Sequence, residues 1–523
     1  MTLHFIDTRG QDDSRPTFSS VIVQGLAPGG GLYLPEVWPQ YSLQQLDGWR
    51  DLPYHQRAAC LYKSFGIDFP EPVTDELMAR IYNPDPTRPY RERWNHADIA
   101  PVVSLDDQTH LLELWHGPTS AFKDLALQCL PQFFTAVIEQ RHIVTHDLNH
   151  DILILVATSG DTGSAALAGF SDRPHTNIIV FYPHGGVSEV QRRQMTARSA
   201  QNLGVFGVRG NFDDCQRAVK RAFEDESFGS WLAHEANLQF SSANSINWGR
   251  LAPQIVYYLS AVCDLRATGQ LTDGQVVDVC VPTGNFGNIL AAWLAKRIGA
   301  PIGRLLCASN ENKILSDFIQ TGIYDTRMRG FKVTTSPSMD ILVSSNLERL
   351  LFLLSDATHV RAWMEQLARD GVFQVDADTL SRLQTDFVGG WVDDATTLAR
   401  IKQTYDSHGY LLDPHTAVAL ELAERERADN PLLIAGTAHW AKFAPNVARA
   451  LTGTAPEAPL PEPYESMGGF ELTRAICALA PGAAPVPENL QRMEHETERF
   501  RDVIDSDAAS IEDAVKSWVR ARG

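Results

Sequence analysis

Short apolar runs alternate with longer amphipathic stretches through the middle of the chain. The first run is Ile-Leu-Ile-Leu-Val-Ala at 152–157, and similar runs follow at 178–182, 205–208, 276–281, 305–308 and 432–435. Continuous apolar runs of this length are typical of strands that are buried on both faces. Amphipathic stretches such as 214–223, 251–265 and 289–298 predict helices between them. The pattern therefore predicts an α/β fold with a mainly parallel sheet and helices on both faces.

The first hundred residues show a different pattern and are expected to form a separate region. A short helix over 18–26 is expected to end at the Ala-Pro-Gly-Gly-Gly turn before a strand at 32–35. Helical patterns continue over 54–65 and 75–82. Three prolines at positions 84, 86 and 89 then mark a boundary.

Composition narrows the function classes. The 523 residues are 44% hydrophobic and carry a net charge of −19, which disfavours binding to nucleic acid and to anionic membranes. Seven cysteines are scattered without a CxxC pair, which argues against structural zinc, so no metal is expected. No apolar run has membrane-spanning length, and the start lacks a signal-like pattern. We expect a soluble, cytoplasmic protein.

One stretch, His-Gly-Pro-Thr-Ser-Ala-Phe-Lys-Asp-Leu-Ala-Leu-Gln at 116–128, carries the strongest chemical signal. Thr119 or Ser120 is expected to cap a helix whose first turn contains Lys123. A helix N-terminus and apolar neighbours both disfavour the ammonium form, so the pKa of Lys123 is expected to be low. A lysine of this kind can form a Schiff base. The alternative is a solvated lysine on an amphipathic helix, and Lys123 alone does not decide between them.

Three of the predicted strands end in loops rich in glycine and hydroxyl or amide side chains. These are Thr-Ser-Gly-Asp-Thr-Gly at 158–163, Pro-Thr-Gly-Asn-Phe-Gly-Asn at 282–288 and Gly-Thr-Ala-His-Trp at 436–440. Ligands bind at the carboxyl ends of parallel strands, where backbone N–H groups and helix N-termini hold anions. One such loop could be an ordinary turn. Three such loops on parallel strands are harder to explain in this way. Two anion-holding loops and a desolvated lysine suggest a phosphorylated cofactor joined through a Schiff base, together with a second anionic group on the substrate.

A fourth polar segment, Ser-Ser-Ala-Asn-Ser-Ile-Asn-Trp-Gly-Arg at 241–250, supports that second anion. Arg250 could bind a phosphate through two hydrogen bonds, with Asn244 and Ser245 donating beside it. The alternative is a helix-capping serine followed by a surface arginine.

Together these motifs resemble the threonine synthases, which are pyridoxal-phosphate enzymes of the tryptophan-synthase-β fold group. The matching segments fall in family order between residue 5 and about residue 450: 8–10, 25–35, 116–128, 158–163, 242–247, 284–288, 336–340, 412–417 and 436–439. The resemblance implies pyridoxal-phosphate fold type II, with two open, mainly parallel sheets and helices on both faces. It also implies an N-terminal domain at 1–100, a catalytic region at 101–450 and a Pro-rich insertion with a helical tail at 451–523.

The resemblance also implies roles for individual residues. Lys123 would hold the cofactor, with Asp161 near the ring hydroxyl and Thr437 beside the pyridine nitrogen. The cofactor phosphate would lie in the loop formed by Gly284, Asn285, Phe286, Gly287 and Asn288. The substrate phosphate would be held by Thr158, Ser159, Thr162, Asn244, Ser245 and Arg250. The implied reaction is a β,γ-replacement that converts O-phospho-L-homoserine and water to L-threonine and phosphate, in a monomer or homodimer.

Two features depart from the family pattern. Trp440 stands where the family usually has proline, close to the expected cofactor ring, and residues 452–487 are an acidic, Pro-rich insertion. We interpret the insertion as a solvated linker with one short helix at 470–479, in preference to a regulatory element. Two other functions stay open: a phospho-lyase or specialised relative that acts on another amino acid, and a non-catalytic binding protein of the same fold. Dehydratases and cystathionine synthases share the fold but lack this lysine context.

Overall fold

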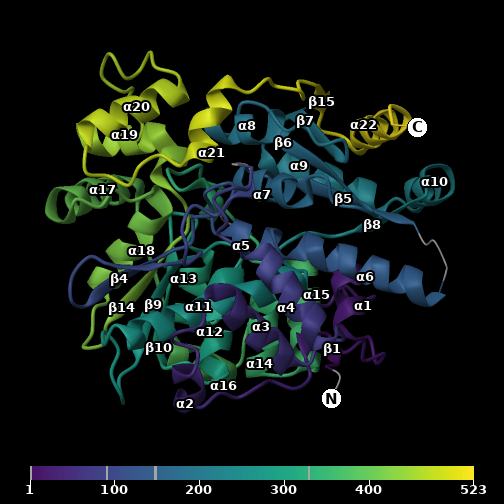
Figure 1. The fold of residues 1–523 in the computed structure, drawn as a ribbon, viewed down its shortest axis with the longest axis horizontal. Helices are drawn as coiled ribbons and strands as arrows, with labels where there is room; N and C mark the ends of the chain where they lie inside the picture. The colour runs from purple at the N-terminus through teal and green to yellow at the C-terminus, as the bar shows by residue number, and fades with distance from the viewer. Residues whose placement is uncertain (1–2, 90–91, 146–149, 328–329, 523) are drawn as a thin grey trace.

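Two open sheets organise the molecule (Figure 1). The computed structural model describes residues 3–89, 92–145, 150–327 and 330–522. The larger sheet has the strand order β13-β10-β9-β14-β4-β3, and the second has the order β15-β7-β6-β5-β8. All neighbouring strands run parallel except β3 and β4. The fold is the predicted α/β type with two mainly parallel sheets.

The strands of the larger sheet are β3 (Val102–Ser104), β4 (Thr109–Glu113), β9 (Val277–Pro282), β10 (Ile302–Ser309), β13 (Phe387–Trp391) and β14 (Leu432–Gly436). Those of the second sheet are β5 (Asp151–Ala157), β6 (Thr176–Pro183), β7 (Leu203–Arg209), β8 (Leu238–Ser241) and β15 (Val503–Asp505). The six apolar runs of the sequence correspond to β5, β6, β7, β9, β10 and β14, so these predictions are confirmed. Their side chains are buried almost throughout, as expected for strands covered on both faces.

Helices cover both sheets. Between residues 123 and 452 they are α5 (Lys123–Leu127), α6 (Leu130–Thr145), α7 (Asp161–Phe170), α8 (Glu189–Thr196), α9 (Phe212–Glu224), α10 (Glu226–Ala236), α11 (Trp248–Ala267), α12 (Gly287–Arg297), α13 (Ile314–Thr321), α14 (Leu347–Leu354), α15 (Ala357–Asp370), α16 (Ala377–Asp386), α17 (Asp394–His408), α18 (Pro414–Arg425) and α19 (Ala444–Thr452). Short elements among them are β11 (Ile323–Asp325), β12 (Val372–Gln374), η2 (Pro337–Met339) and η3 (Trp440–Phe443). Helix α5 lies near the centre of Figure 1, between the two sheets, and packs against α7 and α11.

The N-terminal region packs onto the same core. Its elements are β1 (Phe5–Asp7), α1 (Phe18–Gln24), β2 (Tyr33–Pro35), α2 (Leu43–Asp47), α3 (Tyr54–Phe65) and α4 (Glu71–Ile81). The predicted helices at 18–26 and 54–65 and the strand at 32–35 are confirmed. Aromatic side chains join this region to the rest: Phe5 contacts Trp248 at 5.8 Å, and Phe18 contacts Phe133 at 5.0 Å between ring centroids.

The insertion at 452–487 differs from the prediction of a solvated linker. Its predicted helix is present as α20 (Gly469–Leu479), followed by α21 (Glu488–Gln491), η4 (Arg492–His495) and α22 (Ala508–Arg520). However, Leu460, Phe470 and Ile476 are buried in a core shared with α18 and α19. The linker interpretation is therefore wrong, because the apolar residues between the prolines complete a hydrophobic core.

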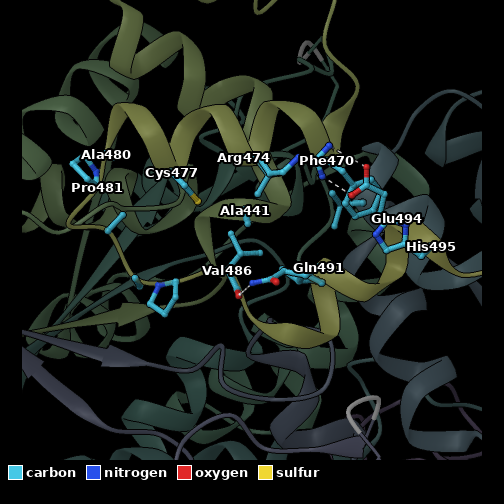
Figure 2. A pocket seen from close by; sticks show the side chains of 16 residues that line it. Ala441, Phe470, Arg474, Cys477, Ala480, Pro481, Val486, Gln491, Glu494 and His495 are labelled. Carbon is cyan, nitrogen blue, oxygen red and sulfur yellow. Dashed lines mark hydrogen bonds and ion pairs between the residues drawn. The ribbon is translucent and has the colours of Figure 1, made fainter.

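The packed insertion lines a partly open cavity of about 510 Å³. Figure 2 shows α20 on one side of the cavity, with Cys477 pointing into it, and α21 and η4 on another. Ala441 of η3 also lines the cavity. Beyond η4 the chain crosses to the second sheet, where β15 pairs with β7. The C-terminal segment thus contacts both halves of the molecule.

Candidate active site

The turn before Lys123 is shaped by one buried carboxylate, that of Asp124. The backbone N–H and the hydroxyl of Thr119 donate to its two oxygens, at 2.8 and 2.7 Å. A Cβ on Gly117 would lie 2.4 Å from the Cβ of Asp124, so only glycine fits there. The predicted cap by Thr119 or Ser120 is wrong: the Thr119 hydroxyl is bound to Asp124, and Phe122 occupies the N-cap position without a side-chain bond.

Lys123 begins α5, as predicted, and its amine faces Asp161. Its Nζ lies 3.7 Å from Oδ2 of Asp161 and 4.8 Å from the centre of the Phe122 ring. Burial lowers the pKa of Lys123; Asp161 opposes this, whereas the positive charges of Lys442 and Arg250 add to it. The predicted direction of the shift is confirmed, and burial is its main cause.

Asp161 is the first residue of α7 and receives donors from several elements. Oδ1 accepts from Nζ of Lys442 at 2.7 Å and from Nε2 of Gln191 at 3.0 Å, and Oδ2 accepts from the Ser338 hydroxyl at 3.1 Å. Burial alone would raise the pKa of Asp161, but Lys442 and Lys123 hold it well below its ordinary value. The carboxylate is therefore ionised at neutral pH.

The loop between β9 and α12 leaves no room for a side chain at its first glycine. A Cβ on Gly284 would lie 2.9 Å from Cδ1 of Ile341 and 3.1 Å from the carbonyl oxygen of Ser338. Phe286 adopts a φ of 64°, which is uncommon for a bulky residue and turns the chain into α12. The loop thus ends at the N-terminus of an 11-residue helix, where free N–H groups attract anions.

Asn288, in the first turn of α12, holds an unpaired donor. Its Oδ1 accepts hydrogen bonds of 2.6 Å from the hydroxyls of both Tyr257 and Tyr258. Its Nδ2 is buried and has no partner among the described residues. An unpaired buried donor is costly, so this group suits a site that receives an acceptor such as a phosphate oxygen.

A serine-rich segment joins this loop to the predicted substrate segment. The Ser344 hydroxyl donates to the carbonyl oxygen of Gly284 at 2.7 Å, and the Ser345 hydroxyl donates to Oδ1 of Asn285 at 3.2 Å. The hydroxyls of Ser345 and Ser245 also lie 3.2 Å apart. The structure therefore brings the 284–288 loop and the 241–250 segment together.

Arg250 is buried without a counter-charge. Its Nη1 donates to the carbonyl oxygen of Ala243 at 2.6 Å, which closes the 243–250 turn, while its buried Nε has no hydrogen-bond partner among the described residues. In the part of the chain that the structure describes, no carboxylate acts on the Arg250 guanidinium. Burial lowers its pKa to about 10. An unpaired buried guanidinium with a free donor is suited to an anionic ligand.

The remaining predicted residues lie at the end of β14, in the 158–163 loop and in the 241–250 segment. The backbone N–H of Phe122 donates to the carbonyl oxygen of Thr437 at 2.8 Å. The end of β14 therefore lies beside the turn at 117–122 that precedes Lys123, here called the lysine turn. The Thr158 hydroxyl accepts from the backbone N–H groups of Gly160 and Gly163, at 3.0 and 2.8 Å, which shapes that loop. Ser159 and Thr162 are half-buried in it, and Asn244 is exposed.

Sequence reasoning assigned no role to Lys442, Gln191 or Ser338. Ser338 lies in the Ser-Pro-Ser-Met-Asp motif, which matched the family, so a signal was present there. Lys442 follows the 436–440 loop by two residues and resembles any lysine in an amphipathic segment. Its complete burial could be known only from the fold.

The donor set fits pyridoxal phosphate. A buried amine of lowered pKa suits an aldehyde, and the helix N-terminus with the free Asn288 Nδ2 suits a phosphate. Among the described residues, no three His, Cys, Asp or Glu side chains are arranged to hold a metal ion. Within the same residues, each helix is too short or too polar to cross a membrane.

Three family models match the chain. "Threonine synthase N terminus" matches residues 4–82, "Pyridoxal-phosphate dependent enzyme" matches residues 101–433, and "Threonine synthase, C-terminal" matches residues 416–515. The last match extends through the Pro-rich insertion to the C-terminal helix.

Individual proteins agree with these models. The chain is 42% identical to threonine synthase-like 1 of Macaca fascicularis. The match covers 84% of this chain but only 59% of the length of that protein. It is 38% identical to the threonine synthase of Pseudomonas aeruginosa, over 87% of this chain and 92% of that one. The solved structure of PLP-bound threonine synthase from Brucella melitensis is 35% identical, with a TM-score of 0.83 over 99% of this chain and 100% of that one. The chain therefore belongs to the threonine synthase family of pyridoxal-phosphate-dependent lyases.

Proposed function

We propose that this family member is a threonine synthase that converts O-phospho-L-homoserine and water to L-threonine and phosphate, with Lys123 as the cofactor lysine. The observation that supports this reaction best is the buried, unpaired guanidinium of Arg250. It belongs to a different segment from the 284–288 loop, and it is close enough to Lys123 for its charge to lower the pKa of that lysine. Two anion sites at one buried amine suit a phosphorylated cofactor and a phosphorylated substrate.

The cofactor would be held by residues of both sheets. The Gly284–Asn288 loop would bind its phosphate through backbone N–H groups and Nδ2 of Asn288. Asp161, which faces Lys123, would lie near the ring hydroxyl, and Thr437, beside the lysine turn, would face the pyridine nitrogen. When bound, pyridoxal phosphate supplies the electron sink that stabilises carbanions at the reacting carbons. The protein contributes orientation and the placement of charge.

The substrate phosphate would be held by Arg250 with Thr158, Ser159, Thr162, Asn244 and Ser245. Charge-assisted bonds from a buried guanidinium are strong because little water competes for them. The Thr158 hydroxyl already accepts two backbone N–H bonds, so its own hydrogen remains available to donate to an anion. The departing phosphate would stay bound at this site during the later proton transfers.

Lys123 would move protons during the reaction. Its lowered pKa leaves a larger share of free amine at neutral pH, and a free amine can take a proton at Nζ and return it to another carbon. Ion pairing of Asp161 with Lys442 leaves Asp161 ionised, so the carboxylate does not compete as a proton donor.

A second candidate is a phospho-lyase that removes phosphate from the same or a related amino acid and gives a different product. The reason to keep it is that a relative with 42% identity is named threonine synthase-like, and the chain spans 59% of that protein. Both functions need the same lysine and anion sites, so only the product separates them.

The deciding experiment is product analysis. Purified protein with pyridoxal phosphate is incubated with O-phospho-L-homoserine, and phosphate, threonine and 2-oxobutyrate are measured, with Lys123→Ala as the control. A threonine synthase releases threonine and phosphate in equal amounts. Mostly 2-oxobutyrate would favour the phospho-lyase, and a protein that binds the cofactor without releasing phosphate would refute both for this substrate.

A further inference from the structure

Two lysines face the same buried carboxylate. Lys442 of η3 is completely buried; its Nζ lies 2.7 Å from Oδ1 of Asp161 and donates to the carbonyl oxygen of Thr119 at 2.8 Å. Lys123 lies farther away, with its Nζ 3.7 Å from Oδ2. A single carboxylate balances a single ammonium group, and the shorter contact assigns that role to Lys442.

We propose that Lys442 is a positioning residue that neutralises Asp161 and thereby keeps Lys123 as the free amine. The proposal rests on the proposed function in one respect, namely that Lys123 is the lysine that captures the cofactor. It adds Lys442 to Lys123 and Asp161, the two buried charged side chains that the resemblance assigned to the cofactor. In this role Lys442 acts on Lys123 through Asp161.

The charges around Lys123 support this division. Three charged groups act on it: Asp161 from α7, Lys442 from η3 and Arg250 from α11. Asp161 favours the protonated amine, whereas Lys442 and Arg250 oppose it. Removing Lys442 would take away a repelling charge and would also leave Asp161 with Lys123 as its nearest cation. Both changes favour protonation of Lys123.

The position of Lys442 in the fold favours an electrostatic role. Its neighbour Ala441 lines the C-terminal cavity (Figure 2), while Lys442 contacts Asp161 and the lysine turn. Burying an ion pair seldom stabilises a protein more than apolar side chains of the same volume would. Stability alone therefore gives little reason for a lysine at this place, whereas control of the Lys123 amine does.

The test measures the protonation of Lys123 without turnover. Apoprotein is mixed with pyridoxal phosphate at a series of pH values, and the rate of covalent capture is followed by the absorbance of the bound cofactor. Borohydride reduction and peptide mass analysis confirm that Lys123 is the residue modified. Only the free amine reacts, so the midpoint of the rate–pH curve reports the pKa of Lys123. Ionisation of the free cofactor is common to all variants.

Lys442→Met should raise the midpoint by at least about one pH unit, which lowers the capture rate at neutral pH about tenfold. Asp161→Asn should lower the midpoint. The double variant should return it close to the native value, because both charges are removed together. A purely structural role for Lys442 would not be reversed by a second substitution.

Two controls complete the design. Lys442→Arg keeps the charge and should keep the native midpoint. Lys296→Met removes a lysine that pairs with Asp386 at 2.6 Å, in the last turn of α12, and should leave the midpoint unchanged.

A folded Lys442→Met variant with the native midpoint overturns the proposal. If that variant does not fold, a raised midpoint in the double variant overturns it instead. Failure of the proposed function looks different: the wild-type protein would capture the cofactor on Lys123 and still release no phosphate from phosphohomoserine.

Discussion

Replacement of Arg250 by methionine should weaken substrate binding and at the same time stabilise the free protein. The guanidinium is buried without a counter-charge, and burial lowers its pKa to about 10. An arginine in water keeps its proton to far higher pH, so the folded state binds this proton less tightly than the unfolded state. That difference corresponds to a cost of roughly 3 kcal/mol for holding the charge at neutral pH. The cost diminishes only as the pH rises through 10.

Methionine removes the charge and keeps most of the side-chain length. It loses the bond from Nη1 to Ala243, which is worth about 1 kcal/mol. The net gain in the free energy of unfolding should therefore be about 1–2 kcal/mol. The same change should raise KM for phosphohomoserine about tenfold to a hundredfold, because a charge-assisted bond contributes about 1.5–3 kcal/mol. Affinity for pyridoxal phosphate should change much less.

Thermal unfolding with and without inorganic phosphate checks this reasoning, beside steady-state kinetics. Phosphate should raise the Tm of the wild-type holoenzyme and have a smaller effect on Arg250→Met, since ligands that bind only the folded state stabilise it. Ser199→Ala, in which the exposed side chain lies outside the site, is the matched control. A large fall in Tm without phosphate would mean that Arg250 is structural. Equal losses of cofactor and substrate affinity would mean that the two anion sites are wrongly assigned.

Three further predictions address the lysine turn and the C-terminal segment. Lys123→Ala should abolish turnover and the bound-cofactor absorbance while the circular dichroism spectrum stays native; appreciable residual activity would contradict the assignment of Lys123. Asn489→Ala should lower kcat and should lower the free energy of unfolding by about 1–3 kcal/mol. The Nδ2 of Asn489 donates to the Pro118 carbonyl oxygen at 2.6 Å, and the substitution leaves that buried carbonyl unpaired. Denaturant unfolding that matches the wild type would refute this. Trp440→Pro should destabilise the protein by about 3 kcal/mol or more, since the indole is buried and its Nε1 donates to the carbonyl oxygen of Ala484 at 3.1 Å. The ratio of threonine to 2-oxobutyrate should stay the same. A shifted product ratio would show that Trp440 shapes the substrate pocket.

Strands that carry continuous apolar runs could be predicted, and β13 shows why others could not. Its sequence, Phe-Val-Gly-Gly-Trp, has two glycines in the middle and reads as a turn. In the structure, a Cβ on Gly389 would lie 3.0 Å from the carbonyl oxygen of Ser316, and one on Gly390 would lie 2.2 Å from Leu422. Helices α13 and α18 pack directly on the strand backbone here, so glycine is required at both positions. Glycine is also uncommon inside strands, and its presence therefore hides β13 from a sequence-based prediction.

The packing of residues 452–487 is hidden from the sequence pattern for a related reason. Seven prolines lie within 452–487, and proline-rich composition is typical of extended linkers. Apolar side chains between these prolines, such as Leu460 and Ile476, pack against α18 and α19 in three dimensions, and the local sequence pattern does not reveal this contact. The family model that spans 416–515 carries the information that the local pattern lacks.

In the candidate active site, too, some residues could be recognised from their sequence neighbours, whereas others depend on contacts between distant segments. Lys123, the 158–163 loop and the 284–288 loop are marked by residues adjacent in sequence, so each could be recognised separately. The ion pair between Lys442 and Asp161 joins segments far apart in the chain, and a buried lysine has no local signature. Pair contacts of this kind are fixed by the packing of η3 against the lysine turn and α7.

The buried charges also give a physical reason why an acidic protein could bind the two anionic groups proposed above. The net charge of −19 repels phosphates at long range, so attraction must come from groups that water does not screen. Asp161 and Lys442 balance each other, Lys123 has a lowered pKa, and Arg250 remains as an uncompensated positive charge. The free protein is less stable for holding that charge, and a bound phosphate would supply its missing partner. On this view, the cost of burying the Arg250 charge and the affinity of this site for phosphate have the same physical origin.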